Sequence, residues 1–507
     1  MENKWETLKL ADLRDIAKKI GVKGASSMKK EELVTLLTEE EKKNMAAKTD
    51  APENAGKQPE EATVKKREPQ KRSPEKNVPE RTSAEKNSAE KSTQEKSITE
   101  KNAPEKNAPE KTISTDKPVE KKESGEEEMA ELDSKIPACG ILEVMPDGFG
   151  FIRCENYLPG EHDVYVAPGQ IRKFGLKTGD IIEGSTKIKT EKEKFSALLF
   201  VKKINGYSPE EAIRRANFED MTPIFPDEKI HLDIPGAPVS MRIMDLISPV
   251  GKGQRGMIVS PPKAGKTTLL KAVAKCVKYS NPDMHMIILL IDERPEEVTD
   301  IKEAIMGPNV EVIYSTFDET PEHHKRVAEM VIERAKRLVE HKKDVIILLD
   351  SITRLTRAYN QVIPPSGRTL SGGLDPAALH MPKRFFGAAR NMREGGSLTI
   401  LATALVETGS KMDDVVYEEF KGTGNMEMVL DRKLSEKRVF PAIDIPKSGT
   451  RREDLLLTPD ELEAINILRK AFNGLKPEEA ADKAIDLFSR TRNNREFSDM
   501  VKKLKWF

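Results

Sequence analysis

A lysine and neighbouring hydroxyl groups follow a short apolar run in the order that a phosphate-binding loop requires. The strand candidate Gly256–Ser260 precedes the segment PPKAGKTT (residues 261–268), and Leu269–Val277 follows with helical spacing. In this strand–loop–helix context, backbone N–H groups hold polyphosphate oxygens. Lys266 would neutralise the β- and γ-phosphates, and the Thr267 hydroxyl can ligate Mg²⁺. The pattern predicts nucleotide binding, and the alternative is an ordinary strand–turn–helix.

Two further apolar runs end in carboxylates. Val345–Leu349 leads into Asp350, and Met286–Ile291 leads through Asp292 into Glu293. A carboxylate at the end of a strand beside the phosphates can hold Mg²⁺ through water, which is the role expected of Asp350. A glutamate in such a place can polarise the attacking water, which is the role expected of Glu293. The alternatives are a helix-start acid for Glu293 and a cap of the next helix for Asp350.

Three arginines near the end of this region could stabilise charge in a transition state. They are Arg438, Arg451 and Arg452. In ring-shaped ATPases such an arginine usually comes from the neighbouring subunit, so hydrolysis would depend on assembly. The alternative is that each is an ordinary surface arginine.

An aromatic strand motif lies among the short strands that the sequence predicts between residues 134 and 207. In DGFGFIR (residues 147–153), Phe149 and Phe151 lie on one face of a strand. Bases can stack on exposed rings, and the arginine that ends the motif can meet a phosphate or a base edge. Tyr165 and Phe195, on other candidate strands, could complete the platform. The alternative is that both phenylalanines point into a core.

Two glycine-bearing loops could offer cations to a nucleic-acid backbone. One is PPSGRTLSGG (residues 364–373), and the other is Glu407–Lys411, which follows the apolar strand Leu398–Val406. Loops like these at a sheet edge could line the central channel of a ring. The alternative is that they are ordinary mobile loops.

Composition limits the classes of protein that remain. Lys+Arg and Asp+Glu both number 85 in 507 residues, so a uniformly basic nucleic-acid binder is excluded. Three cysteines without CxxC spacing cannot form a disulfide framework, and this suggests a reducing cytoplasm. The longest apolar runs are much shorter than the ~20 residues that a membrane span needs.

The chain is predicted to hold more than one folded unit. We expect an N-terminal helical domain at 1–45, a disordered Lys/Glu-rich repeat linker at 46–133, and a small all-β OB barrel at 134–207. A proline-bearing connector at 208–245 would lead to an α/β ATPase domain with C-terminal helices at 246–507. Apolar runs alternate there with amphipathic helices, as in a parallel sheet covered on both faces.

Several long motifs together carry a family resemblance. GFGFIR is followed in order by PPKAGKT, LLIDERPEEV, VIILLDSITRLTRAYN, RFFGAARN, TGSKMD, EEFKGTGNME and SEKRVFPAIDI. This series resembles the Rho family of bacterial transcription termination factors, over residues 1–45 and 134–507. The resemblance implies a cytoplasmic homohexameric ring of RecA-like domains that uses ATP and Mg²⁺. Such a ring would bind nascent, pyrimidine-rich single-stranded RNA, unwind RNA–DNA and dismantle the RNA polymerase elongation complex.

The resemblance also implies roles for individual residues. Glu293 would be the catalytic base, Asp350 the acid that with Thr267 serves Mg²⁺, Arg451 the arginine finger and Arg438 a second arginine from the neighbouring subunit. Phe440 would stack on adenine and Arg294 would contact the nucleotide site. The phosphate loop would comprise Lys263, Ala264, Gly265, Lys266, Thr267 and Thr268. The segment Gly251, Lys252, Gly253, Gln254, Arg255 and Gly256 would border the nucleotide.

For RNA, the resemblance implies a primary site on the barrel and a secondary site in the channel. The primary site would be Gly148, Phe149, Gly150, Phe151, Ile152, Arg153, Asp163, Val164, Tyr165, Glu193, Lys194 and Phe195. The secondary site would be Arg368, Thr369, Leu370, Ser371, Gly372, Gly373 and Lys411. Three positions depart from the family's usual pattern or from the generic loop: Ser260, Phe195 (often Tyr) and Arg368 (commonly Lys).

Two rival functions stay open on the sequence. A rotary or secretion-type ATPase subunit would share the nucleotide-binding core but would have no reason for the GFGF strand. A non-hydrolysing RNA-binding scaffold would leave Glu293, Asp350 and the phosphate loop without a purpose. ATP turnover with and without RNA separates the three.

Overall fold

The computed structural model describes residues 28–30, 33–35, 132–190 and 193–504. The predicted N-terminal helical domain and the predicted repeat linker lie almost entirely outside these residues. Within the described chain, no helix is both long enough and apolar enough to cross a membrane.

Five strands close into the barrel that the sequence predicts. They pair in the order β1-β2-β3-β5-β4, with β1 returning to β4, and only β3 and β5 run parallel. Buried aliphatic side chains such as Leu142, Ile152, Ile182 and Ile204 fill the interior. The strands are β1 Asp133–Val144, β2 Gly150–Arg153, β3 Val164–Val166, β4 Ile181–Lys187 and β5 Ser196–Ile204. A short helix, α4 Pro168–Phe174, follows β3 and was not predicted; its proline at the first position and Gly175 in the left-handed conformation at its end define it.

The predicted connector contains more structure than expected. It holds α5 Pro209–Ile213, a 3₁₀ turn at Phe218–Asp220, β6 Pro223–Ile224 and most of α6 Val239–Ile247. Residues Met241 to Ile247 are all buried, and their apolar side chains pack in the same core as α7 Lys266–Ser280. Helix α6 therefore crosses the boundary predicted at 245/246 and belongs to the core of the following domain.

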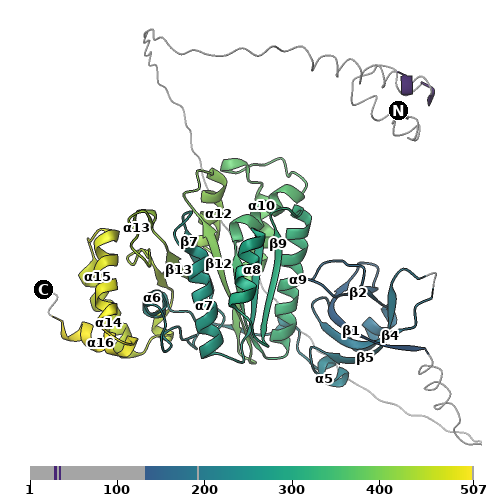
Figure 1. The fold of residues 1–507 in the computed structure, drawn as a ribbon, viewed down its shortest axis with the longest axis horizontal. Helices are drawn as coiled ribbons and strands as arrows, with labels where there is room; N and C mark the ends of the chain where they lie inside the picture. The colour runs from purple at the N-terminus through teal and green to yellow at the C-terminus, as the bar shows by residue number, and fades with distance from the viewer. Residues whose placement is uncertain (1–27, 31–32, 36–131, 191–192, 505–507) are drawn as a thin grey trace, which may run out of the picture. The chain divides into compact units, whose positions relative to one another are not determined.

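A mostly parallel sheet organises the rest of the chain (Figure 1). Its order is β14-β13-β7-β12-β10-β8-β9, with β14 antiparallel at one edge and a short antiparallel extension through β11 and β6. The strands are β7 Arg255–Ser260, β8 His285–Glu293, β9 Val310–Thr316, β10 Asp344–Asp350, β11 Arg390–Met392, β12 Ser397–Leu405, β13 Met426–Val429 and β14 Gly449–Thr450. The prediction of a parallel sheet is confirmed.

Helices cover both faces because successive side chains of each buried strand point to opposite sides. Ile288 and Ile346 join one core with α6, α7, α8 and the C-terminal helices, whereas Ile287 and Ile347 join the other core with α9, α10, α11 and α12. These helices are α8 Pro295–Ala304, α9 Pro321–Glu340, α10 Ile352–Val362, α11 His380–Gly387, α12 Lys411–Lys421, α14 Pro459–Phe472, α15 Pro477–Ser489 and α16 Asn494–Lys503. The short helix α13 Arg432–Glu436 belongs to a separate small cluster, in which Leu434 packs with Ala442 and with Ala481 of α15. The capping box predicted at Thr458 and Glu461 is present at the start of α14.

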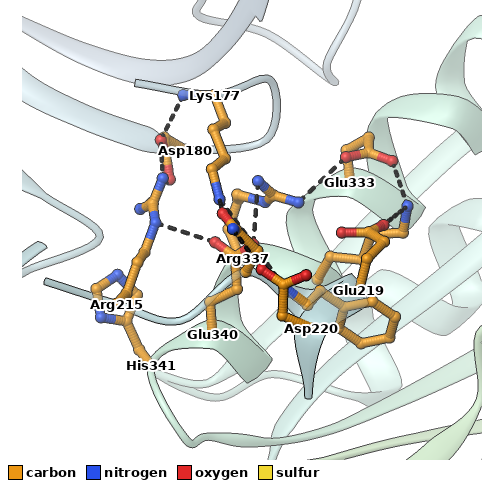
Figure 2. A network of polar contacts seen from close by, with 12 residues as sticks. Lys177, Asp180, Arg215, Glu219, Asp220, Glu333, Arg337, Glu340 and His341 are labelled. Carbon is orange, nitrogen blue, oxygen red and sulfur yellow. Dashed lines mark hydrogen bonds and ion pairs between the residues drawn. The ribbon is translucent and has the colours of Figure 1, made fainter. Parts of the chain in front are cut away.

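A buried ion-pair network fastens the barrel to the end of α9 (Figure 2). Arg215 donates to both carboxylate oxygens of Asp180, at 2.6 and 2.7 Å, and its Nε lies 3.0 Å from Glu340. Lys177 of the barrel also reaches Glu340, at 3.1 Å. Since Asp180, Arg215 and Glu340 are almost fully buried, this network holds the barrel on α9 in a defined position.

The loop after β2 makes a second attachment, to the edge strand β9. The Asn156 side chain pairs with the backbone of Tyr314 in both directions, at 2.7 and 3.1 Å, as another strand would. The neighbouring Tyr157 hydroxyl donates to the Glu311 carboxylate. The barrel thereby covers part of an edge that would otherwise expose unpaired backbone groups.

Candidate functional site

The lysine of the predicted phosphate loop meets both predicted carboxylates. Lys266 begins α7, directly after the loop that leaves β7, and its Nζ lies 2.9 Å from Glu293 Oε1 and 2.5 Å from Asp350 Oδ1. The acids end β8 and β10, whose carboxyl ends lie at the same edge of the sheet. The structure therefore brings together the three residues that the sequence singled out for phosphate chemistry.

Burial alone has opposite effects on two of these pKa values: it raises the pKa of Glu293 and lowers the pKa of Lys266. Burial and the Asp350 charge raise the pKa of Glu293, and this outweighs the lowering effects of Lys266 and Arg354. Burial disfavours the ammonium form of Lys266, but the Asp350 and Glu293 charges outweigh it and raise its pKa. Glu293 is thus a buried base with a more basic carboxylate than usual, beside a lysine that stays charged.

Two polar residues that were not predicted from the sequence also belong to this cluster. Thr403, on β12 between β7 and β10, donates to Asp350 Oδ1 at 2.7 Å. Arg354, in the first turn of α10, lies 3.7 Å from Glu293 and 3.2 Å from Asp292. Arg354 stands four residues after Asp350, a spacing that could have indicated it; nothing in the sequence near Thr403 points to Asp350.

The phosphate loop has the conformation that an anion site requires. Gly265 adopts a left-handed φ of 92° at the start of α7, and a Cβ there would meet no atom within 4 Å. The loop's backbone thus opens toward the helix N-terminus, where the partial positive charge favours phosphate. The Thr267 hydroxyl lies 3.4 Å from Glu297. Among the described residues, no group of three or more His, Cys, Asp or Glu has the arrangement of a metal site.

An apolar hollow of about 550 Å³ adjoins the phosphate loop. Lys263, Gly265 and Thr268 line it from the loop side, and Phe440 lines it from the segment after α13. The Phe440 ring is half exposed, so one face is open to a flat ligand. Phe440 is therefore placed where a nucleotide base bound at this loop could stack.

The two other predicted nucleotide contacts of this edge are exposed. Arg438 stands two residues before Phe440, and its side chain is exposed. Its predicted role as a second arginine supplied by a neighbouring subunit stays a prediction. Arg294 precedes α8 directly after Glu293, and its side chain is 67% exposed with only a 3.9 Å approach to Glu297.

The segment Gly251–Gly256 lies at the other end of β7. Lys252 pairs with Asp344 at the start of β10, and Gln254 donates to Asn425 just before β13. Since β7 has six residues, its two ends are roughly 20 Å apart. Within one chain, this segment therefore lies about one strand length from the phosphate loop, and its predicted place beside the nucleotide stays a prediction.

Arg451 shares this amino edge with the segment. Its backbone N–H bonds to Asn425 at 2.8 Å, and it lines a polar hollow of about 650 Å³ with Arg452 and Lys421. Burial, with Arg390 and Arg451 nearby, lowers the pKa of Arg255. Arg451 is exposed and cannot reach the Lys266 cluster of its own chain.

The four predicted aromatic residues form one cluster on the barrel. Phe149 and Phe151 lie 5.8 Å apart, Tyr165 lies 5.8 and 6.0 Å from them, and Phe195 lies 5.2 Å from Phe151. All four rings are partly exposed, while Ile152, which directly follows Phe151, is fully buried. The alternative that these rings form the barrel core is wrong.

The charged residues of the predicted RNA site are arranged less uniformly. Arg153 is buried, stacks 4.8 Å from the Phe151 ring centre, and pairs with Glu143 at 2.7 Å and with Asp163. Lys194 is exposed and lies 5.2 Å over Phe195. Glu193 is exposed and accepts a bond from Thr190 N–H. Arg153 therefore supports the platform from within the protein instead of standing free.

The two predicted channel loops pack directly on each other. Gly372 has a φ of 79°, and a Cβ there would lie 2.4 Å from Met412 N, next to Lys411 at the start of α12. Arg368 and Lys411 are both exposed. The structure thus places the two loops side by side and leaves both predicted cations in solvent.

Family models match most of the chain. The Rho termination factor N-terminal domain matches residues 6–44, the Rho termination factor RNA-binding domain matches 138–210, and the nucleotide-binding domain of the ATP synthase alpha/beta family matches 240–450. Among solved structures, a type III secretion system ATPase of pathogenic bacteria is 23% identical, covers 62% of this chain and 94% of that one, and has a TM-score of 0.47.

Curated relatives are far more similar and share one name. The transcription termination factor Rho of Pseudomonas aeruginosa is 56% identical over 74% of this chain and 90% of its own length. The proteins of that name from Aquifex aeolicus and Bacillus subtilis are each 56% identical, over 71% and 73% of this chain and 83% and 86% of their own lengths. The chain therefore belongs to the Rho family of transcription termination factors, which are RNA-binding ATPases.

Proposed function

We propose that this chain assembles into a homohexameric ring in the cytoplasm and couples Mg²⁺-dependent ATP hydrolysis to movement along nascent, pyrimidine-rich RNA. The ring unwinds RNA–DNA and acts on the RNA polymerase elongation complex. One observation carries this proposal: a partly buried lysine between two strand-end acids lies in the same folded unit as an open aromatic platform. A pump ATPase has no use for the platform, and a passive RNA binder has no use for the acids.

Hydrolysis uses the cluster at the carboxyl edge of the sheet. ATP places its phosphates on the loop before α7 and its base against Phe440, and a bound Mg²⁺ would be served by Thr267 and Asp350. Mg²⁺ supplies charge neutralisation at the phosphates. Lys266 can leave its two carboxylate partners for the phosphates, which frees Glu293 to accept a proton from water.

Arg451 completes the site from a second copy. It stands at the amino edge of the sheet, about one strand length from its own phosphate loop. A head-to-tail contact between copies, which closes into a ring, brings the amino edge of one chain to the carboxyl edge of the next. The segment Gly251–Gly256 would border the neighbour's nucleotide in the same way.

RNA is held at two places with different tasks. The platform of Phe149, Phe151, Tyr165 and Phe195 captures single-stranded bases by stacking, which is tolerant of sequence apart from stacking strength. The loops with Arg368 and Lys411 offer cations to the backbone in the channel. Lys411 begins α12, which follows β12 of the ATPase sheet, so a movement of that sheet is passed to RNA.

Transcript release from a stalled elongation complex tests this function. A complex of bacterial RNA polymerase with a C-rich transcript is mixed with the chain, with ATP or with a non-hydrolysable analogue. We expect release with ATP and none with the analogue. Equal release in both conditions, or no release in either, would contradict the proposal.

A further inference from the structure

The RNA platform of the barrel rests on an arginine that the protein itself holds in place. Arg153 is 6% exposed and lies 4.8 Å from the Phe151 ring centre. Its Nε and Nη2 both lie 2.7 Å from Glu143 Oε2, and its Nη1 bonds to Asp163. With this geometry, the guanidinium plane is fixed by two carboxylates, and the ring stacked on it is fixed in turn.

The carboxylate that holds Arg153 is itself held by the ATPase domain. Arg326, in the second turn of α9, donates from Nη2 to both Glu143 oxygens at 2.8 and 2.7 Å. Glu143 is 16% exposed and Arg326 34% exposed, so the pair is only partly screened by water. The order of contacts is therefore Arg326, Glu143, Arg153 and Phe151, from an ATPase helix to a ring of the platform.

The charges of this chain of contacts balance only when Arg326 is included. Glu143 and Asp163 carry two negative charges, and Arg153 supplies one positive charge. Without Arg326, a net negative charge would remain beside the surface where RNA phosphates approach, and it would repel them. Glu143 would also lose two of its hydrogen bonds and its defined position.

The ion-pair network at the C-terminal end of α9 supports the contact between Arg326 and Glu143. Glu340, at the last turn of the helix, is held by Arg215 and Lys177 (Figure 2). The barrel thus contacts α9 near both of its ends, and the network at Glu340 helps to keep the helix beside Glu143.

We infer that Arg326 is a positioning residue of the RNA site: helix α9 of the ATPase domain completes the barrel's aromatic platform through Glu143 and Arg153. This inference rests on the proposed function, because it takes the platform as the place where RNA is captured. It assigns part of the RNA affinity to a residue outside the barrel that need not touch RNA.

The experiment measures binding of a fluorescein-labelled oligo(C) RNA to the full-length chain by anisotropy. Arg326→Gln removes the charge and the bonds to Glu143, and we expect about two- to fivefold weaker binding. Arg326→Lys keeps the charge and should recover part of the loss. Lys325→Gln is the matched control, because it removes a charge from the adjacent position, where Lys325 makes only an exposed 3.9 Å approach to Glu329. Thermal unfolding of each variant checks that it is folded.

A double-mutant cycle separates positioning from direct contact. If Arg326 acts through Glu143, then Arg326→Gln in a Glu143→Gln background should weaken RNA binding no further. Additive losses would show that Arg326 touches RNA itself, and they would overturn the inference. An unchanged affinity in Arg326→Gln, or an equal loss in Lys325→Gln, would also overturn it.

A further variant separates failure of this inference from failure of the proposed function. Phe149→Ala with Phe151→Ala should weaken oligo(C) binding by roughly tenfold or more, since each stacked base contributes ~1–3 kcal/mol. If that variant binds RNA normally, then the platform is not the capture site and the proposed function fails. If it binds weakly while Arg326→Gln binds normally, then only the role of Arg326 fails.

Discussion

At the scale of single residues, the ATP site depends on competition for one ammonium group. Lys266 lies within hydrogen-bond distance of both Glu293 and Asp350. When phosphates take the lysine, Glu293 loses its nearest positive partner and keeps the repulsion from Asp350. In the proposed mechanism, nucleotide binding therefore makes the Glu293 carboxylate a better base when ATP is present.

Replacing the base separates binding from chemistry. Glu293→Gln keeps the shape and the bond to Lys266 but cannot take a proton, so we expect ATP binding to persist while RNA-stimulated turnover falls roughly 100-fold or more. Glu296→Gln, an exposed acid in the first turn of α8, is the matched control and should turn over normally. Normal turnover in Glu293→Gln would remove this residue from the role of base.

The raised pKa of Glu293 gives the pH profile a direction. The base must be ionised, so turnover is lost as pH falls through the pKa of Glu293, which lies above that of an ordinary glutamate. Arg354 lowers this pKa, so Arg354→Gln should move the acid limb of the turnover–pH curve to still higher pH. If the acid limb of the Arg354→Gln curve stays in place or moves to lower pH, then the assignment of Glu293 as the base is contradicted.

Whether a site residue could be predicted from the sequence depends on its place within a helix or strand. Lys266, Glu293 and Asp350 each end or begin an element with a strong local pattern, so both their elements and the shared sheet edge could be predicted. Thr403 could not be predicted as a partner of Asp350, because it lies within a strand and meets Asp350 only through the strand order β12-β10. The pairing of Arg326 with Glu143 was missed for the same reason, since 183 residues separate them.

At the scale of elements, two loops must move as one if they are to pass ATPase movements to RNA. The backbone of Gly372 lies against Met412 so closely that no side chain fits between them. The close contact joins the loop with Arg368 to the start of α12 with Lys411. It is a property of backbone packing, and the sequence showed only that both loops contain glycine.

Opening this contact should uncouple the loops. In Gly372→Ala the new Cβ would lie 2.4 Å from Met412 N, so the loop must shift away from α12. We expect reduced RNA stimulation of turnover with unchanged oligo(C) affinity at the barrel. Gly373→Ala is the matched control, because it has the same strained backbone, φ 82°, but no atom within 4 Å of the new Cβ. Equal effects of the two substitutions would show that backbone strain, and not the contact, is responsible.

The elements themselves were predictable in proportion to their local signals. The five barrel strands, the parallel sheet and the capping box at Thr458 follow from alternation, apolar runs and capping residues. The prolines before α6 predict a connector, so the sequence does not assign this helix to the ATPase domain. Its place in the core depends on packing against α7. The sequence also left open whether Phe149 and Phe151 face inward, because period-two alternation cannot tell the inside of a small barrel from its outside.

At the scale of the whole molecule, the two halves of the proposed hydrolysis site lie at opposite edges of one sheet. Lys266 and Glu293 stand at the carboxyl edge and Arg451 at the amino edge, so no chain can supply both to one ATP. A complete site therefore requires contact between copies, as proposed for the ring.

Mixing two inactive variants tests this division directly. Glu293→Gln lacks the base and Arg451→Ala lacks the arginine, and each alone should have little turnover. Co-assembled from unfolded or dissociated chains, they form some interfaces with an intact Glu293 on one side and an intact Arg451 on the other. We expect turnover to reappear in the mixture. A mixture as inactive as its components would show that Arg451 does not act across the interface.

The coupling of ATP hydrolysis to RNA is tested most directly by two measurements on the wild-type chain. They are its ATP turnover with and without poly(C), and its oligomeric state. We expect a hexamer whose ATP turnover is slow without RNA and rises strongly when poly(C) is added, because threaded RNA and ATP cleavage share one ring. A chain that stays monomeric and hydrolyses ATP at the same rate with and without poly(C) would contradict this coupling.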